Sequence, residues 1–223
     1  MMRYFKIYNS GSLDVIGHYP QTKYKDSYNP RLSNSHWQVP INEFPNFKPV
    51  YDLELFPESI ATNFLDGCGG CHGFIVDSKL KKILEEHKLP PHKFYEINVS
   101  KNNQVLEYYW LHYIVENIWQ YINYDVSKLR IQSSTNPKNY TVLPAIDEIY
   151  VKKLAKYYAF NTEFSILPEH IVLNTSNQIY DIIDLNYLNQ GPLISHRLKE
   201  SFTKNEISGC ELKLLKELSM STT

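Results

Sequence analysis

Residues 73–99 constrain the fold most, because within this stretch the hydrophobic pattern changes from that of a strand to that of a helix and back. Gly-Phe-Ile-Val at 73–76 is a short apolar run typical of a buried strand end, and Asp77 is a favourable helix N-cap. The apolar side chains that follow recur at helical spacing on one face: Leu80, Ile83 and Leu84. The pattern predicts a strand that leads directly into an amphipathic helix.

The other side and the end of this helix are marked as well. Charged residues form the side that faces solvent: Lys79, Lys81, Lys82, Glu85 and Glu86. Pro90 and Pro91 cannot continue a helix, and residues 94–99 alternate between apolar and polar side chains as a strand does. The predicted unit is strand, helix, strand.

The aromatic-rich stretch Val105–Tyr124 shows both periods. Its first half alternates from Leu106 to Ile114 like a strand, whereas Ile114, Ile118 and Tyr121 repeat like a helix. We expect a strand that leads into a helical turn. Its Tyr and Trp side chains are either anchors of an interface or, as is commoner, the core of a sheet.

Further along the chain, polar segments separate the predicted elements. Residues 131–144 are polar and turn-rich, and residues 146–160 carry a helical pattern with two acidic residues in its first turn. Ile171–Leu173 and Ile179–Leu185 are apolar runs on either side of a short polar loop, which predicts a β-hairpin.

The first part of the chain, residues 1–66, is rich in turn formers, and its prolines are too closely spaced for a long helix. Short strands are expected at Tyr4–Tyr8, near Trp37–Val39 and at Pro49–Leu53. Because aromatic residues recur throughout, we expect this segment to wrap onto the core and not to act as a linker.

The length of 223 residues suits one sizeable core, so we expect a single domain spanning 1–223, with a loop-rich N-terminal part at 1–66 and a core at 67–223. The 43% hydrophobic content, with 18 Tyr and 10 Phe, excludes a disordered chain.

The charge and hydropathy of the chain restrict the classes of partner that we expect it to bind. The 23 basic and 24 acidic residues are evenly spread, which disfavours a nucleic-acid binder. No apolar run is long enough for a membrane helix and no signal peptide is recognisable, so a cytoplasmic location is expected. The odd number of cysteines argues for reduced thiols: Cys68, Cys71 and Cys210.

A second segment, residues 191–212, repeats the first unit. Its beginning aligns without a gap on the chain from Gly73, so that Gly191 matches Gly73 and Ser195 takes the N-cap place of Asp77. The matched positions have the same structural roles in both segments, in the same order: a buried strand end, a helix N-cap, then an apolar stripe. The alternative is that any two junctions between a strand and a helix look alike.

The pattern of a short aliphatic strand, Ser or Asp, a basic residue, Leu and Lys resembles immunity-protein family eleven of bacterial polymorphic toxin systems. Gly73–Val99 and Gly191–Leu212 resemble its hallmark segments, and Tyr108–Ile114 and Asp125–Ile131 are similar to its middle region. The resemblance covers about the last two thirds of the chain and concerns structural positions only. It implies a protein that binds and neutralises a cognate toxin.

The local motif Gly67-Cys-Gly-Gly-Cys-His-Gly73 matches a c-type haem attachment site. Haem attachment ordinarily occurs in exported proteins, and the methionines at 1, 2 and 220 are poor candidates for an axial ligand. A zinc site is a second possibility, with Cys68, Cys71 and His72 as ligands. The fourth ligand would come from one of three residues: Cys210, His87 or His92.

Other chemistry is less well supported by the sequence. A redox function of Cys68 and Cys71 would need a helix to start at the pair, but the predicted helix starts near Asp77. No catalytic motif such as Gly-x-Ser-x-Gly or a Walker loop occurs. The eight histidines form no tight cluster in sequence, and we interpret most as surface or satisfied core residues.

Together these patterns predict an α+β fold with a mixed, mostly antiparallel sheet, in which two similar strand-to-helix units pack on one core. The expected function, which rests on the resemblance, is stoichiometric toxin binding without catalysis, cofactor, nucleic acid or membrane. Two alternatives stay open: a metal- or thiol-dependent enzyme using Cys68, Cys71 and His72, and a structural or regulatory binding module. The sequence assigns no catalytic, binding or metal residue and no oligomeric state.

Overall fold

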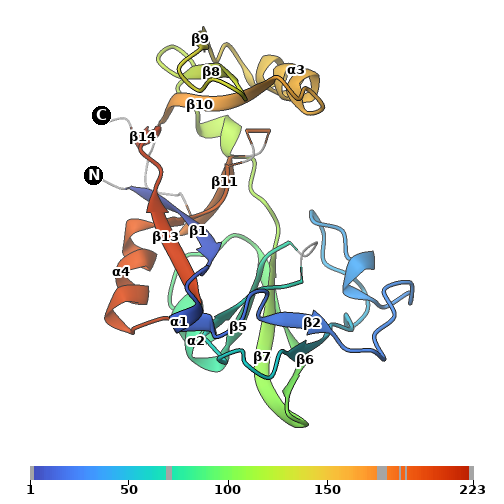
Figure 1. Cartoon of the computed structure of the whole chain (residues 1–223). Coiled ribbons are helices and arrows are strands. Elements are labelled where there is room, and N and C mark those ends of the chain that lie inside the picture. The colour runs from blue at the N-terminus through green and yellow to red at the C-terminus, as the bar shows by residue number, and fades with distance from the viewer. Residues whose placement is uncertain (1–2, 69–71, 175–179, 186, 189, 221–223) are drawn as a thin grey trace. The chain divides into compact units, whose positions relative to one another are not determined.

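The computed structural model describes residues 3–68, 72–174, 180–185, 187–188 and 190–220. It is an α+β protein with three sheets that are mostly antiparallel, one of them curled into a half-barrel (Figure 1). In the described residues, no helix is long and apolar enough to cross a membrane.

The chain divides into two compact units, each assembled from separate stretches of sequence. Unit 1 comprises Met1–Lys6, Glu116–His196 and Lys213–Thr223, and unit 2 comprises Ile7–Val115 and Arg197–Leu212. The expectation of one domain spanning 1–223 stays a prediction.

Unit 2 contains a six-stranded sheet in the order β2-β3-β6-β7-β5-β4. Its strands are β2 (Thr22–Tyr24), β3 (Asp52–Leu55), β4 (Phe64–Leu65), β5 (Phe74–Asp77), β6 (His92–Lys101) and β7 (Gln104–Tyr113). All pairs are antiparallel except β3 with β6. Residues 1–66 therefore supply three strands of this sheet, as well as β1 (Tyr4–Asn9) and the short helix α1 (Leu13–Ile16).

The long hairpin of β6 and β7 confirms the two strands predicted there, and the helical turn after β7 is the 3-10 helix η2 (Ile118–Tyr121). Asn102 and Asn103 at the hairpin tip have φ values of 49° and 64°, a conformation that asparagine tolerates better than most residues. Trp110 of β7 is 2% exposed and Trp119 of η2 is fully buried. These tryptophans are core residues and not interface anchors.

The first predicted unit is confirmed as β5 followed by α2 (Ser78–Glu85). The Asp77 carboxylate accepts a hydrogen bond of 2.8 Å from the Leu80 amide, as an N-cap does. All three predicted apolar positions, Leu80, Ile83 and Leu84, are buried. The helix ends before Pro90, with Glu86 as its C-cap.

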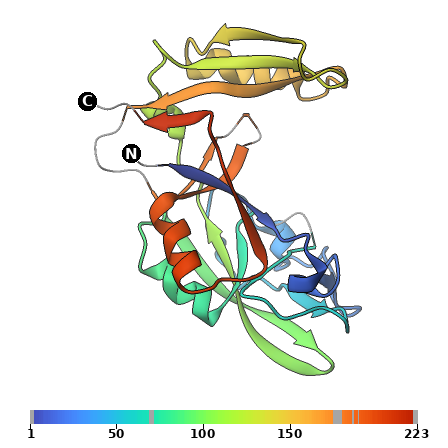
Figure 2. The same ribbon diagram turned by 60° about the vertical axis from the view of Figure 1, so that its left-hand side comes forward.

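The second predicted unit is confirmed as β12 (Gln190–Ser195) followed by α4 (His196–Lys204). Ser195 directly precedes the helix, but its hydroxyl donates to the Asp181 carboxylate. Within unit 2, the Lys79 ammonium of α2 donates to the Asn205 carbonyl after α4, and the Ser201 hydroxyl lies 3.1 Å from His87 Nε2. The two helices therefore lie side by side (Figure 2).

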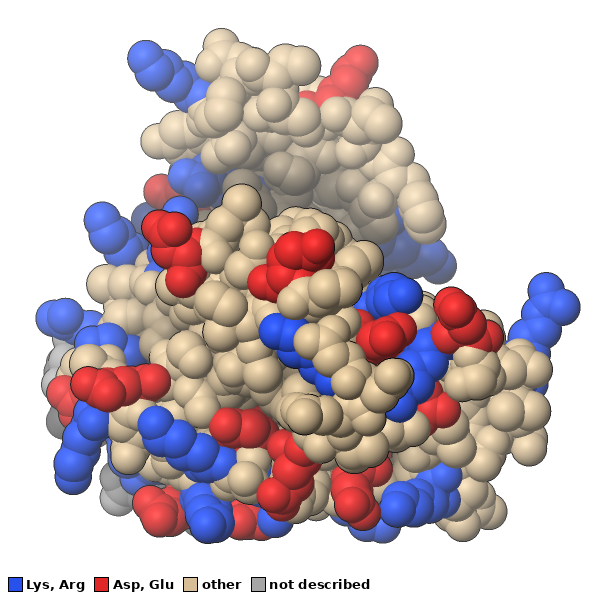
Figure 3. Space-filling model, turned by 60° about the horizontal axis from the view of Figure 1, so that its bottom comes forward, with Lys and Arg blue, Asp and Glu red and all other residues tan. Residues whose placement is uncertain are grey.

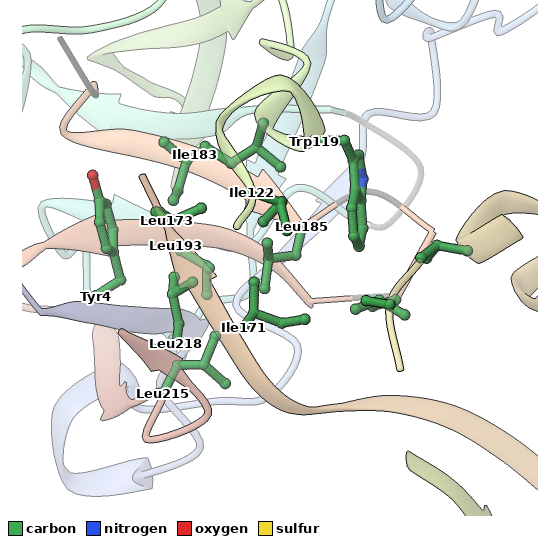
Figure 4. Close-up of a cluster of buried hydrophobic side chains, with 14 of the residues drawn as sticks. Tyr4, Trp119, Ile122, Ile171, Leu173, Ile183, Leu185, Leu193, Leu215 and Leu218 are labelled. Carbon is green, nitrogen blue, oxygen red and sulfur yellow. The ribbon is translucent and has the colours of Figure 1, made fainter. Parts of the chain in front are cut away.

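The remaining sheets have four strands each, in the orders β11-β12-β1-β13 and β14-β10-β8-β9. Their other strands are β8 (Lys128–Ser133), β9 (Tyr140–Pro144), β10 (Phe164–Leu173), β11 (Ile182–Leu185), β13 (Cys210–Leu214) and β14 (Leu218–Met220). The predicted helix within 146–160 is α3 (Glu148–Tyr158), with Asp147 as N-cap. The core of unit 1 gathers side chains such as Trp119, Leu173 and Leu193 (Figure 4).

Three local predictions are wrong. Trp37–Val39 is not a strand, because the Ser35 hydroxyl accepts from the Trp37 amide and caps the 3-10 helix η1 (His36–Gln38). The bounds of the strand expected near Pro49–Leu53 are wrong, although the strand itself is confirmed as β3, which begins only at Asp52. The turn-rich segment 131–144 contains the end of β8 and all of β9, which pair in antiparallel fashion.

The predicted hairpin of 171–173 with 179–185 is also wrong. β10 pairs with β8 and β14, whereas β11 pairs with β12. Part of the predicted hairpin, residues 175–179, lies outside the described residues. Both strands exist, but each finds a partner distant in sequence.

Candidate functional site

The loop with the Cys-x-x-Cys-His motif leads into β5. Cys71 lies outside the described residues, whereas Cys68 and His72 are described. The Cys68 Sγ atom lies 3.1 Å from the Thr22 hydroxyl, and Cys68 has a φ of 52°. Neither Cys68 nor Cys210 forms a disulfide.

His72 is held against the end of β7 by several contacts. Its Nε2 lies 3.0 Å from the Tyr113 carbonyl, and its own carbonyl accepts a hydrogen bond of 2.8 Å from Trp110 Nε1. Gly73 makes this close approach possible: it has a φ of 106°, and an added Cβ would lie 1.9 Å from the Leu111 carbonyl oxygen. The glycine thereby fixes where the histidine lies.

His112 reaches the same place from β7. Alternation along this strand puts Trp110 and His112 on one face, and the His112 side chain is fully buried. Its Nε2 lies 3.1 Å from the Glu43 carbonyl, while its Nδ1 is buried and has no hydrogen-bond partner among the described residues. The rings of His72 and His112 are nearly perpendicular, with centroids 6.0 Å apart.

Burial lowers the pKa of His72, against the opposing effect of its hydrogen bond to Tyr113. Burial likewise lowers the pKa of His112, and the neighbouring His72 lowers it further. Both rings are therefore neutral near pH 7. Because a carbonyl only accepts, each Nε2 carries the proton, and each Nδ1 keeps a lone pair.

The ligands that the sequence offered to complete a zinc site do not converge with His72. His87 Nδ1 donates to the Ile83 carbonyl, and His92 Nδ1 donates to that of Pro90. Burial raises the pKa of the Cys210 thiol to about 12, so this sulfur is protonated near pH 7. Among the described residues, no group of three or more His, Cys, Asp or Glu side chains gathers as the four-ligand zinc site considered from the sequence would require.

A further histidine, His36, is part of a separate aromatic cluster in unit 2. Its ring stacks on Tyr51 with centroids 3.7 Å apart, and its Nδ1 lies 2.7 Å from the Tyr28 hydroxyl. Burial lowers the pKa of His36 to about 4. This histidine is a satisfied core residue, as the sequence analysis expected of most histidines.

The second candidate site is a surface of unit 1 on helix α3. The inner side of the helix packs on the unit 1 core through Val151, Leu154, Ala155 and Tyr158. Four large apolar side chains on α3 or directly beyond its two ends are exposed, and we call them the α3 outer face: Ile146 before the N-cap, Ile149 and Tyr157 on the helix, and Phe160 after the C-cap. Tyr157 is 73% exposed and Phe160 is 93% exposed.

Lysines border the α3 outer face. Lys153 and Lys156 are exposed on the same side of the helix, and neither forms an ion pair among the residues that the structure describes. The nearby Glu148 carboxylate is engaged by Asn117 and Tyr187. The surface is thus apolar and locally basic. By contrast, basic and acidic side chains are interspersed over much of the face shown in Figure 3.

The sequence predicted one helical pattern over residues 146–160 but did not distinguish an inner from an outer side of that helix. It also did not connect His112 with His72. The α3 outer face was detectable, because at 3.6 residues per turn the apolar positions cover more than one side of the helix. The sequence matches no protein-family model and has no significant match among curated proteins.

Proposed function

We propose that this protein binds a cognate bacterial toxin in the cytoplasm and neutralises it as a stoichiometric complex, without catalysis. The α3 outer face is the observation that carries the proposal. The resemblance of residues 73–99 and 191–212 to immunity-protein family eleven supplies the kind of partner.

The exposure of these side chains supports a binding role. Burying a Phe or Ile side chain stabilises a protein by about 1.5–3 kcal/mol, so leaving four large apolar groups in water forgoes a favourable term of that order for each. Large exposed apolar patches typically mark interaction sites, and these four side chains lie on one short helix or directly beyond its ends. Aromatic side chains such as Tyr157 and Phe160 are also well suited to the buried centre of an interface.

The border of the surface indicates the chemistry of the partner. Lys153 and Lys156 lie among the apolar side chains of the α3 outer face. A toxin surface with an apolar centre and an acidic rim would match both features. Opposite charges at the rim would mainly raise the association rate and make it depend on salt.

The two strand-to-helix units of the fold resemble each other, as they would in a protein of the proposed kind. We infer that β5–α2 and β12–α4 are diverged copies of one unit. Support comes from the side-by-side placement of α2 and α4 within unit 2. The strands differ, because Ile75 of β5 and Leu193 of β12 belong to separate clusters of buried side chains.

The test is co-purification of the tagged full-length protein from its native host, with mass spectrometry of the bound chains. We expect one chain at equal stoichiometry. That chain should be toxic when expressed alone and harmless when this protein is co-expressed. Recovery of no such chain would count against toxin binding.

Two variants locate the surface. The double substitution Tyr157→Ala and Phe160→Ala should abolish recovery of the toxin chain and protection from it. Val105→Ala is the matched control, because Val105 is 76% exposed and lies in unit 2. If both variants retain the partner, the toxin binds elsewhere.

A further inference from the structure

We propose that His72 and His112 bind a divalent transition-metal ion, of the Zn²⁺ class, through their Nδ1 atoms. The proposal goes beyond toxin binding and does not depend on it. It also differs from the zinc site considered from the sequence, because His112 replaces the distant ligand expected there.

The hydrogen bonds of the two rings support this assignment. Each Nε2 is directed at a backbone carbonyl, that of Tyr113 for His72 and that of Glu43 for His112. A metal-ligating histidine almost always donates its other ring N–H to such a group, which fixes the tautomer and the orientation of the ring. In this protein two neighbouring histidines each have such a hydrogen bond from Nε2 to a backbone carbonyl.

The unpartnered nitrogen supplies an independent observation. His112 is fully buried, and within the part of the chain that the structure describes its Nδ1 has no hydrogen-bond partner. Buried polar atoms are nearly always satisfied, and each exception in a folded protein calls for an explanation such as an ion. The Nδ1 lone pair is a ligand, and the His72 ring centroid lies only 6.0 Å away from that of His112.

The ligand type selects the class of ion. Neutral imidazole suits Zn²⁺, Cu²⁺ or Ni²⁺, whereas Mg²⁺ and Ca²⁺ prefer oxygen. Because no third His, Cys, Asp or Glu converges among the described residues, the two imidazoles are the protein ligands of the proposed site. A site with two protein ligands should bind Zn²⁺ more weakly than a closed structural site with four.

The experiment is a titration of chelator-treated, full-length protein with ZnCl₂, followed by calorimetry. We expect one equivalent to bind. His72→Gln and His112→Gln should each weaken binding by at least the roughly 10- to 100-fold that loss of an outer-shell partner costs. His170→Gln is the matched control, since His170 is exposed on β10, and it should leave the affinity unchanged.

Because His112 is buried, its substitution is expected to destabilise unit 2, so a measurement on the unaltered protein is added. Nitrogen-15 NMR of the imidazoles should show the Nδ1 resonances of two histidines shifting on addition of Zn²⁺, with the His72→Gln variant assigning one of them. Absence of saturable binding, or shifts confined to other histidines, would overturn the proposal.

Discussion

Helices α2 and α3 are built alike at their beginnings but differ on their outer sides. Each starts with an aspartate N-cap, Asp77 or Asp147, whose carboxylate accepts from the amide three residues on. On α2 the outer side is charged, with an ion pair of 3.1 Å between Lys81 and Glu85. On α3 the exposed outer side carries large apolar side chains as well as Lys153 and Lys156. Helix α2 thus presents charged groups to solvent, whereas α3 presents the apolar groups that we propose as a binding surface.

The largest loss of stability is expected for a substitution on the buried side of α2. Leu84→Ala should destabilise the protein by about 2–5 kcal/mol, because Leu84 is fully buried and its removal leaves a cavity. Ile149→Ala removes a comparable side chain from the α3 outer face and should change stability by no more than about 0.5 kcal/mol. Urea denaturation of both variants measures the difference. Equal losses would mean that the α3 outer face is internally packed.

A second prediction uses pH to examine a buried group of unit 2. His36 has a folded pKa of about 4 and an ordinary unfolded value of 6.5. Between pH 6.5 and 4 the unfolded chain therefore binds the extra proton, so stability falls as pH falls through this window and is retained in full above it. Urea midpoints at pH 7.5 and 5 should differ more for the unaltered protein than for His36→Gln. The same pH dependence in both would refute this role of burial.

Substitution of either N-cap should destabilise the protein by a smaller amount, and the two losses should differ. Asp77 caps α2 and also accepts 2.7 Å from the Asn63 side-chain amide, whereas for Asp147 the only side-chain hydrogen bond among the described residues is the cap itself. Loss of a cap costs roughly 0.5–2 kcal/mol. We expect Asp77→Ala to lie near the upper end and Asp147→Ala near the lower end, as measured by thermal unfolding. The reverse order would contradict the comparison.

The elements predicted correctly are those whose signals are local. An N-cap, a periodic stripe and alternation predicted α2, α3 and the separate strands β6 and β7, because each signal lies within one element. The hairpin of β10 with β11 was wrong for the opposite reason. Strand partners are chosen by packing over long sequence distances, and β11 instead pairs with β12.

The same contrast between local signals and long-range packing applies to the candidate sites. Proximity of His72 to His112 depends on the register of β5 against β7, in which Phe74 pairs with Leu111, and no local pattern encodes that register. The matched glycines of the repeat also differ in role. Gly73 has a positive φ, whereas Gly191 leaves room for the Asp184 carboxylate. The alignment of the two segments therefore matches the two glycines but does not show that their structural roles differ.

The smallest expected effect is on the stability of the protein without its partner. Replacing Tyr157 and Phe160 by serine should leave the urea midpoint nearly unchanged, because both side chains are exposed in the folded protein and in the unfolded chain. Sedimentation velocity should likewise give the same mass for the variant and the unaltered protein. A dimer that dissociates on substitution would assign the α3 outer face to a second copy of this chain instead of a toxin. An unchanged mass with lost toxin binding would leave the apolar side of α3 to the partner, in contrast to the charged side of α2.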